Sequence, residues 1–215
     1  MAEGAAAYER GDYATALEEW LPLAEQGHAS AQSNLSLMYA TGIGVPQDFV
    51  EAVKWTRLAA EQGHADPQLT LGVRYEHGDG VVPQDDAEAV KWYRLAAEQG
   101  HAEAQTHLGS MYQQGKGVPQ DFAEAVNLDR LAAKWYRLAA EQGHAEAQAL
   151  LGNMYVQGLG VPQDYVQAHM WINLAAAHGL DAAPNGRDMI AELMAPADIS
   201  EAQRLAREWI EEHGE

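Results

Sequence analysis

The chain has 215 residues, of which 47% are hydrophobic, so it can bury a substantial core and does not have the composition of a disordered chain. Its 32 acidic residues against 13 Lys and Arg give a formal net charge of −19, which disfavours binding to nucleic acid or to anionic membrane surfaces. The absence of cysteine excludes disulfides, thiolate metal sites and cysteine nucleophiles.

The first residues of the chain as given do not have the pattern of a signal peptide. Residues Met1 to Gly4 lack the basic and apolar regions of a signal peptide, so none is expected in the chain as given. The protein is then expected to be cytoplasmic, or periplasmic or secreted if the sequence is that of a mature form. No apolar run approaches the length of a transmembrane helix, so no membrane insertion is expected.

A repeated pattern divides the sequence into units. Within a unit, Ala, Leu and Tyr recur four residues apart, which predicts one apolar stripe on a first helix, helix A. A Gly-x-Gly-Val loop and Pro-Gln-Asp then end that helix, and a second apolar-periodic stretch, helix B, closes the unit. The units begin with Gly-His-Ala at Gly27, Gly63, Gly100 and Gly143, at spacings of 36, 37 and 43 residues.

The position after the leucine of helix A is always small. Because glycine inside a helix costs about 1 kcal/mol relative to alanine, its recurrence predicts a neighbouring helix that packs too close for a β-carbon. The residues at this position are Ser36, Gly72, Gly109 and Gly152.

Helix B is predicted to begin with a capping box, in which an aspartate and an acidic or amide residue three positions later cap each other's backbone N–H groups. The predicted pairs are Asp48 with Glu51, Asp85 with Glu88, Asp121 with Glu124, and Asp164 with Gln167.

We expect a single repeat domain over residues 1–215, made of about six helix-turn-helix units. One tryptophan falls in each predicted helix B, at Trp20, Trp55, Trp92, Trp135, Trp171 and Trp209. The predicted segments are an N-terminal half-unit or cap at 1–26, full repeats at 27–62, 63–99, 100–142 and 143–178, and a degenerate C-terminal repeat or cap at 179–215.

Three recurring segments carry a family resemblance. They read Ala-x-Gln-x-x-Leu-Gly-x-x-Tyr, Gly-x-Gly-Val-Pro-Gln-Asp and Glu-Ala-Val-Lys-Trp-Tyr-Arg-Leu-Ala-Ala-Glu-Gln-Gly. Over residues 27–178 the chain resembles the Sel-one-like repeat family, a relative of the tetratricopeptide repeat. The resemblance implies an all-α fold, a right-handed α-α superhelix or solenoid, used as an adaptor or scaffold and often found in bacterial secreted, periplasmic or signalling settings. It implies no particular partner.

The third unit is longer than the others by seven residues, 127–133, which contain neither Gly nor Pro. Seven residues make two helical turns with a residual rotation of only ~20°. We therefore expect one long helix B from about 121 to 142, extended by about 10 Å. Two interpretations stay open: exposed Leu128 and Leu131 contact a partner or a second copy, or the insertion is a neutral duplication.

The sequence offers no motif for catalysis or metal binding. His-Glu-x-x-His and Ser-x-x-Lys are both absent, and the carboxylates fall mostly at caps, loops and exposed helix faces. Histidines recur at His28, His64, His101 and His144, but packed helices lie about 8–10 Å apart, too far for equivalent residues to share one ion. We interpret them as residues of the junctions between helices and expect no enzyme activity, no metal and no cofactor.

Solenoids usually bind partners along a concave face lined by the A helices. Positions that vary between units while the pattern repeats are the candidates, and their amides, hydroxyls and small apolar side chains suit an extended peptide. Given the acidic charge, we expect a neutral or basic protein or peptide. The candidate partner-binding residues are Asn34, Leu37, Thr70, Val73, Arg74, His77, His107, Ser110, Leu150, Asn153 and Gln157.

Three alternatives to this groove remain at the level of the sequence. The variable positions can simply face solvent and drift. The chain can be a structural protein that self-associates through its ends or through the 127–133 insert. It can also be an enzyme with an unrecognised carboxylate site.

Overall fold

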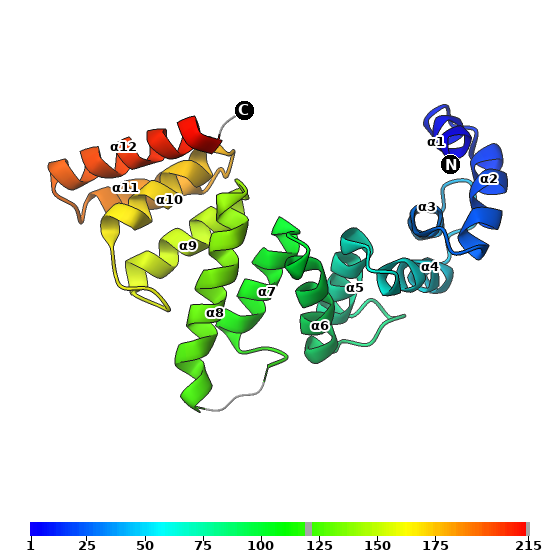
Figure 1. The fold of residues 1–215 in the computed structure, drawn as a ribbon, viewed down its shortest axis with the longest axis horizontal. Helices are drawn as coiled ribbons and strands as arrows, with labels where there is room; N and C mark the ends of the chain where they lie inside the picture. Colours follow the sequence, from blue (N-terminus) through cyan, green and yellow to red (C-terminus); the bar gives the residue numbers. More distant parts are fainter. Residues whose placement is uncertain (119–121, 214–215) are drawn as a thin grey trace. The chain divides into compact units, whose positions relative to one another are not determined.

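The computed structural model describes residues 1–118 and 122–213, and for 122–127 the backbone alone (Figure 1). In this part of the chain all regular structure is helical, which confirms the predicted all-α class. No described helix combines the length and apolar character needed to cross a membrane. The helices are α1 (Ala2–Glu9), α2 (Tyr13–Glu25), α3 (Ala29–Thr41), α4 (Phe49–Glu61), α5 (Ala65–His77), α6 (Asp86–Glu98), α7 (Ala102–Gln114), α8 (Phe122–Glu141), α9 (Ala145–Gln157), α10 (Tyr165–Ala177), α11 (Ala183–Ala191) and α12 (Pro196–His213).

The helices form two compact units, Met1–Gln99 and Gly100–Glu215. In unit 1, the hairpins α1–α2, α3–α4 and α5–α6 pack one after another through α2 with α3 and α4 with α5. In unit 2, α7–α8 packs on α9–α10 through α8 and α9, and α10 also contacts α11 and α12. In each repeat the first helix, helix A, is therefore α3, α5, α7 or α9, and helix B is the helix that follows.

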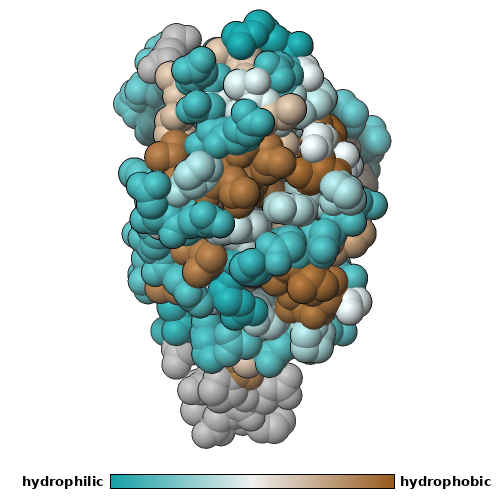
Figure 2. Space-filling model, turned by 90° about the vertical axis from the view of Figure 1, so that its right-hand side faces the viewer, coloured by the Kyte–Doolittle hydropathy of each residue, from teal (hydrophilic) through white to brown (hydrophobic). Residues whose placement is uncertain are grey.

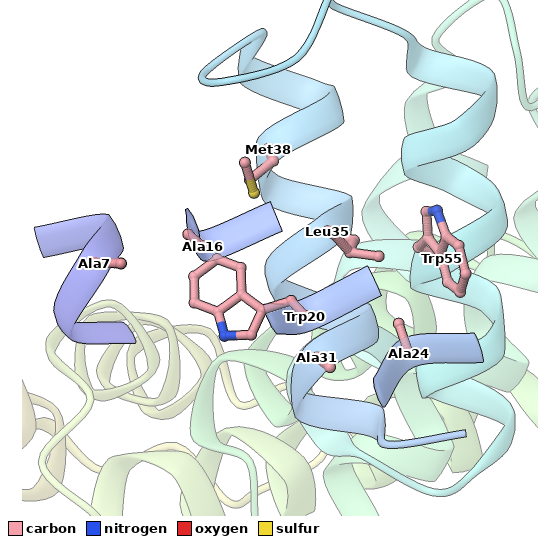
Figure 3. Packing of buried hydrophobic residues seen from close by; sticks show 8 residues of the cluster. All are labelled: Ala7, Ala16, Trp20, Ala24, Ala31, Leu35, Met38 and Trp55. Carbon is pink, nitrogen blue, oxygen red and sulfur yellow. The ribbon is translucent and has the colours of Figure 1, made fainter. Parts of the chain in front are cut away.

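The core of the N-terminal part is built from small residues around two indole rings (Figure 3). Trp20 of α2 and Trp55 of α4 are 3% and 6% exposed, and each packs among alanines of neighbouring helices. Alanine allows the helices to approach closely enough for one large ring to fill the space between them. The cluster consists of Ala7, Ala16, Trp20, Ala24, Ala31, Leu35, Met38 and Trp55.

The predicted close approach at the small residues of helix A is confirmed. A β-carbon added to Gly109 of α7 would lie 2.6 Å from Cε1 of Tyr136, a fully buried ring on α8. On Gly152 of α9 it would lie 2.5 Å from Cγ1 of Ile172 on α10. Gly72 of α5 meets the ring of Tyr93 in the same way. The glycines thus allow helix A and helix B of one repeat to pack around a buried side chain.

In each predicted capping box whose side chains the structure describes, the bonds to the aspartate side chain form, but the return bond to the aspartate backbone N–H does not. The Asp48 carboxylate accepts hydrogen bonds from the backbone N–H of Val50 (2.9 Å) and Glu51 (3.1 Å), which caps α4. The Asp48 N–H, however, donates to the Tyr39 carbonyl oxygen at 2.9 Å instead of to Glu51, because the loop folds back onto the end of α3. The Glu51 carboxylate is left to bind Lys54 Nζ at 2.9 Å.

The same correction holds in two further repeats. The N–H of Asp85 donates to Tyr75 O at 2.8 Å, and that of Asp164 donates to Tyr155 O at 3.0 Å. Both carboxylates cap the following helix, as predicted. The predicted pair Asp121 and Glu124 lies outside the residues whose side chains the structure describes.

Buried glutamines join successive repeats. Gln68 Nε2 donates to the Ala60 carbonyl oxygen of α4 at 3.0 Å, and Gln68 Oε1 accepts from Gln99 Nε2 at 2.7 Å. Gln32 makes the corresponding bonds to Ala24 and Gln62. Each of these glutamines therefore ties its own helix A both to the preceding helix B and to the end of the following one.

The seven-residue insertion extends α8 without a break, as expected. The helix runs from Phe122 to Glu141, 20 residues against 13 for α4, α6 and α10. Leu128 and Leu131 are half-buried, not exposed as predicted.

Candidate functional site

The predicted partner-binding residues all lie on A helices, but their exposure differs. Asn34 and Leu37 are on α3, Thr70 to His77 on α5, His107 and Ser110 on α7, and Leu150 to Gln157 on α9. The exposed ones are Leu37, Thr70, His77, Asn153 and Gln157. The half-buried ones are Asn34, Val73, Arg74, His107, Ser110 and Leu150.

Three of these residues meet in one cleft of about 240 Å³ between α3 and α5 of unit 1. Leu37 lies on the α3 side and is 51% exposed, while Thr70 and Arg74 lie on the α5 side. The cleft is lined by Ser33, Ser36, Leu37, Ala40, Thr56, Asp66, Pro67, Thr70 and Arg74. Figure 2 shows that apolar and polar residues are interspersed over one face of the molecule.

Part of the cleft lining stands where the next repeat has a buried tyrosine and the glutamate that binds its hydroxyl. In the next repeat, Tyr93 of α6 packs on Gly72, and its hydroxyl donates to Glu76 Oε2 at 2.5 Å. The first repeat has Thr56, Ser36 and Ala40 at these three positions, and all three line the cleft. Threonine and alanine are smaller than tyrosine and glutamate, so volume that is filled in the second repeat is open in the first.

Tyr136 occupies the same position in the third repeat. Its hydroxyl donates to Gln113 Oε1 at 3.0 Å and also bonds Ser110 Oγ at 3.0 Å. Burial raises the pKa of Tyr136 to about 12, so the hydroxyl stays protonated. The predicted site residue Ser110 therefore takes part in an internal contact between α7 and α8.

The hydroxyls of the cleft are oriented by their own helices. Ser33 Oγ donates to Ala29 O at 3.1 Å, and Thr70 Oγ1 donates to Asp66 O at 2.9 Å. A hydroxyl that donates inward keeps acceptor lone pairs for a ligand. The cleft can therefore accept hydrogen bonds from N–H groups beside the apolar surface of Leu37.

Arg74 lines the cleft and pairs with a residue of the loop that follows α5. Its guanidinium forms an ion pair with Asp79, while Arg74 Nε is buried without a hydrogen-bond partner. Burial pushes the pKa of Asp79 upward, but hydrogen bonds from the backbone N–H of Val82 and Val81 and the pairing with Arg74 outweigh it and lower the pKa. The carboxylate is thus kept charged, and Arg74 is a neutralised edge of the cleft.

The remaining predicted residues are not brought into this cleft. His77 Nδ1 lies 3.1 Å from the Val73 carbonyl oxygen, within α5 itself. The residues on α7 and α9 belong to unit 2. The sequence-based prediction did not include Ser36, Ala40 and Thr56. The signal that could have found them is a departure from the repeated pattern, since the next two repeats have Gly, then Glu or Gln, and Tyr at these three positions.

The recurring histidines begin the A helices. His28, His64, His101 and His144 are the N-cap residues of α3, α5, α7 and α9, and the rings of the last two accept hydrogen bonds from the N–H of Ala104 and Ala147. Within the described ranges, no three His, Asp or Glu side chains are grouped so that they could hold a metal ion.

Comparison with known families decides the identity of these repeats. The Sel1 repeat model matches residues 29–64, 68–101, 102–144 and 145–180. The chain belongs to the Sel1 repeat family. No curated protein matches it significantly.

Solved structures of Sel1 repeat proteins share the fold. A Sel1 repeat protein from Oxalobacter formigenes is 32% identical, with a TM-score of 0.74 over 96% of this chain and 83% of that one. The protective antigen c5321 of uropathogenic Escherichia coli, which displays an SLR fold, is 29% identical, with a TM-score of 0.59 over 94% of this chain. This chain spans only about half, 49%, of that antigen. The immunity protein PA5088 of Pseudomonas aeruginosa is 18% identical with a TM-score of 0.55 over 99% of this chain and 84% of that one, a likeness of fold alone.

These findings confirm the predicted family and the α-α superhelical fold class. Sel1 repeat proteins are generally scaffolds for protein interaction and are typically non-catalytic. The neighbouring structures are bacterial, in agreement with the bacterial setting that the resemblance implied.

Proposed function

We propose that this Sel1 repeat chain is a non-enzymatic adaptor or scaffold that binds a protein or peptide in the groove lined by its A helices. The observation that carries the proposal is the α3–α5 cleft, which joins Leu37, Thr70 and Arg74 from two successive A helices. A groove that runs across neighbouring A helices is the usual binding surface of an α-solenoid.

The size and lining of the cleft favour a peptide side chain as its occupant. Its volume of about 240 Å³ is below the range of roughly 300–1,000 Å³ typical of small-molecule sites. Leu37 supplies an exposed apolar surface, and Ser33 and Thr70 supply hydroxyl oxygens that can accept hydrogen bonds. An apolar side chain flanked by backbone N–H groups satisfies both requirements.

The charge of the chain favours a neutral or basic partner. With a formal net charge of −19, it attracts basic proteins at long range and repels acidic ones. Because Arg74 is already neutralised by Asp79, the cleft itself does not oppose a basic residue.

A capture experiment with matched variants tests the proposal. The folded chain is used to capture proteins from a lysate beside Leu37→Asp, which places a charge at the cleft, and Val50→Asp, which places the same charge on α4 outside it. Leu37 and Val50 are both exposed apolar helical residues, at 51% and 63%. A protein retained by the parent chain and by Val50→Asp, but lost with Leu37→Asp, is identified by mass spectrometry, and its affinity is measured with purified components. Equal retention by both variants contradicts binding in the cleft.

Self-association through an end of the chain is a second candidate, favoured by one observation. Met189 of α11 is 70% exposed, and Leu193, four residues later, is 62% exposed. In a helical or near-helical segment this spacing places both side chains on one side. Two large apolar residues exposed together are typical of an interaction surface.

A further inference from the structure

Positive charge is scarce in this chain, and several of its cations are neutralised locally. Among the described residues, Lys54 pairs with Glu51 and Lys91 with Glu88. Further ion pairs join Arg74 with Asp79, Arg187 with Asp188, and Arg204 with both Glu201 and Glu208.

The heptad insertion changes this pattern on α8. In the first two repeats, the lysine before the tryptophan finds its glutamate three residues earlier, at Glu51 or Glu88. The corresponding lysine in the third repeat is Lys134, and the inserted residues place Leu131 three positions before it and Arg130 four positions before it. Leu131 therefore stands where the other repeats have the carboxylate, and the residue next to it, one turn before Lys134, is the cation Arg130.

Three exposed cations consequently follow one another along α8. Arg130, Lys134 and Arg137 are separated by four and three residues, so they share one side of the helix. None of the three belongs to an ion pair among the residues the structure describes. Arg137 donates a hydrogen bond from Nη2 to the Tyr155 hydroxyl at 2.6 Å, which orients its guanidinium from α9.

These cations line a cleft of about 260 Å³ between α8 and the loop that follows α9. The loop rests directly on the inserted turns, because a β-carbon on Gly160 would overlap the carbonyl group of Asp129 and the nitrogen of Arg130. Gly160 has a φ of +67°, which also favours glycine there. The described lining is Arg130, Ala133, Lys134, Arg137, Leu138, Glu141, Gly160 and Val161.

A cleft beside α4 in unit 1 provides a contrast. It is lined by Lys54 together with Glu25 and Glu61, and Lys54 is already paired with Glu51. The cleft on α8 has three cations and a single carboxylate, Glu141, among its described lining residues. The cleft on the repeat that carries the insertion thus has an excess of positive charge that the cleft beside α4 lacks.

We propose that the cleft between α8 and the α9–α10 loop binds the carboxylate side chains of an acidic peptide segment on a protein partner. The two guanidinium groups and the ammonium group match carboxylates in charge and as hydrogen-bond donors. Ala133, Leu138 and Val161 add apolar surface between them, which suits a peptide with apolar residues next to its acids. The site lies in unit 2 and does not depend on the α3–α5 cleft of unit 1.

A polyanion does not fit the same surface. A nucleic acid or an anionic membrane must approach the whole chain, whose net charge of −19 repels it. A short segment bearing a few carboxylates on an otherwise neutral or basic protein avoids that repulsion and still pairs with the local cations.

A synthetic probe tests the proposal by calorimetric titration. The probe is a capped peptide in which glutamate alternates with small apolar residues, and its control has glutamine in place of every glutamate. The acidic peptide is expected to bind about tenfold more tightly than the glutamine peptide, in keeping with charge-assisted hydrogen bonds, and to weaken as salt is added. Equal affinities of the two peptides overturn the proposal.

Matched charge reversals locate the binding. Arg130→Glu removes a cation and places a carboxylate four residues before Lys134, a spacing that pairs well on a helix. Arg207→Glu makes the same change of charge at an exposed position of α12 in the same unit. We expect Arg130→Glu to weaken binding of the acidic peptide about tenfold and Arg207→Glu to change it less than about twofold. Equal losses contradict a local site.

Two further measurements separate loss of the site from loss of the fold, and a peptide site from a general anion site. Circular dichroism shows whether Arg130→Glu is folded, and the double variant Arg130→Gln with Lys134→Gln repeats the test without a new carboxylate. Inorganic phosphate alone is titrated into the parent chain and is expected to show no saturable binding. Saturable phosphate binding that disappears in Arg130→Glu overturns the peptide proposal in favour of a general anion site.

Discussion

Ser36 Oγ and Thr56 Oγ1 share a hydrogen bond of 2.6 Å between α3 and α4, at the place where the second repeat has Gly72 against the ring of Tyr93. Both arrangements join helix A to helix B of their own repeat, but the side chains differ in volume. The tyrosine fills the space between them and reaches Glu76. The Ser36 hydroxyl bonds Thr56 Oγ1, and the Thr56 hydroxyl donates to the Ala52 carbonyl oxygen at 2.9 Å. This pair leaves an open cleft, so the proposed binding surface arises from one local exchange in a repeated pattern.

Restoring the repeated pattern should close the cleft. The triple variant Ser36→Gly, Ala40→Gln and Thr56→Tyr copies the arrangement of Gly109, Gln113 and Tyr136 in the third repeat. We expect a melting temperature no lower than that of the parent chain and loss of the partner captured through the cleft. Thermal unfolding measures the melting temperature, and a binding titration measures the loss of the partner.

A single substitution provides the control for this design. Thr56→Tyr alone leaves the Ser36 side chain where the ring must lie, so overpacking should lower the free energy of unfolding by about 1–3 kcal/mol. Retained binding by a stable triple variant would show that the partner does not enter the cleft.

Two Gly→Ala substitutions should have opposite effects on stability. Gly109→Ala places a β-carbon 2.6 Å from the fully buried ring of Tyr136 and should lower the free energy of unfolding by about 1–3 kcal/mol. In Gly186→Ala the nearest atom, Cγ2 of Ile172, is 3.8 Å away, so the gain in helix propensity of up to about 1 kcal/mol should prevail. Urea unfolding measures both, and a stabilised Gly109→Ala would contradict the packing described.

Acid should weaken the folded state partly through His169 of α10. The side chain is 2% exposed, and its Nδ1 has no hydrogen-bond partner. Burial lowers the pKa of His169, Arg187 lowers it further, and Asp188 acts in the opposite direction. As the pH falls through the unfolded-state pKa of about 6.5, the unfolded chain takes up a proton that the folded chain resists, so stability is lost.

Replacement of this histidine should reduce that loss. Between about pH 7.5 and about pH 5.5, on either side of the unfolded-state pKa, His169→Leu should lose less free energy of unfolding than the parent chain. His64→Leu, at an exposed position, should follow the parent chain. Denaturant unfolding at both pH values gives the comparison, and parallel pH dependences of His169→Leu and the parent would refute the assignment.

The exposed apolar residues Met189 and Leu193 give a test of the alternative function, self-association. If the chain self-associates there, its mass by light scattering should rise with concentration, and Met189→Glu with Leu193→Glu should return it to that of a monomer. Val50→Glu, which alters an equally exposed apolar residue on α4, should leave the association unchanged. A mass that is independent of concentration in the parent chain excludes this function.

The repetition of the sequence explains why so much of the fold could be predicted. Helix A and helix B recur with the same apolar spacing, so a helix that is ambiguous in one unit can be assigned from the others. Gly109 indicates a close approach of two helices because glycine inside a helix is otherwise unfavourable. The seven-residue insertion likewise predicts a continuous α8, since two whole turns preserve the buried face.

The candidate site was predicted less completely, because it depends on how far individual side chains reach. Ser110 varies between repeats and is predicted to face a partner, but the Tyr136 hydroxyl extends to it across the hairpin. Thr56 is not among the predicted site residues because it lies on helix B, although its small size opens the cleft. Glu51 is predicted to complete a capping box, whereas the loop leaves it to pair with Lys54. None of these contacts follows from helical spacing alone.

The glutamine junctions have a consequence for how the gene can change. Gln32 Nε2 with the Ala24 carbonyl oxygen and Gln68 Nε2 with the Ala60 carbonyl oxygen form the same hydrogen bond at two successive boundaries, 3.0 Å long in both. A recombination event between two such boundaries would join helix ends that already carry matching donors and acceptors. The array can therefore grow or shrink by whole repeats during evolution, and each new boundary forms its hydrogen bond without any further mutation.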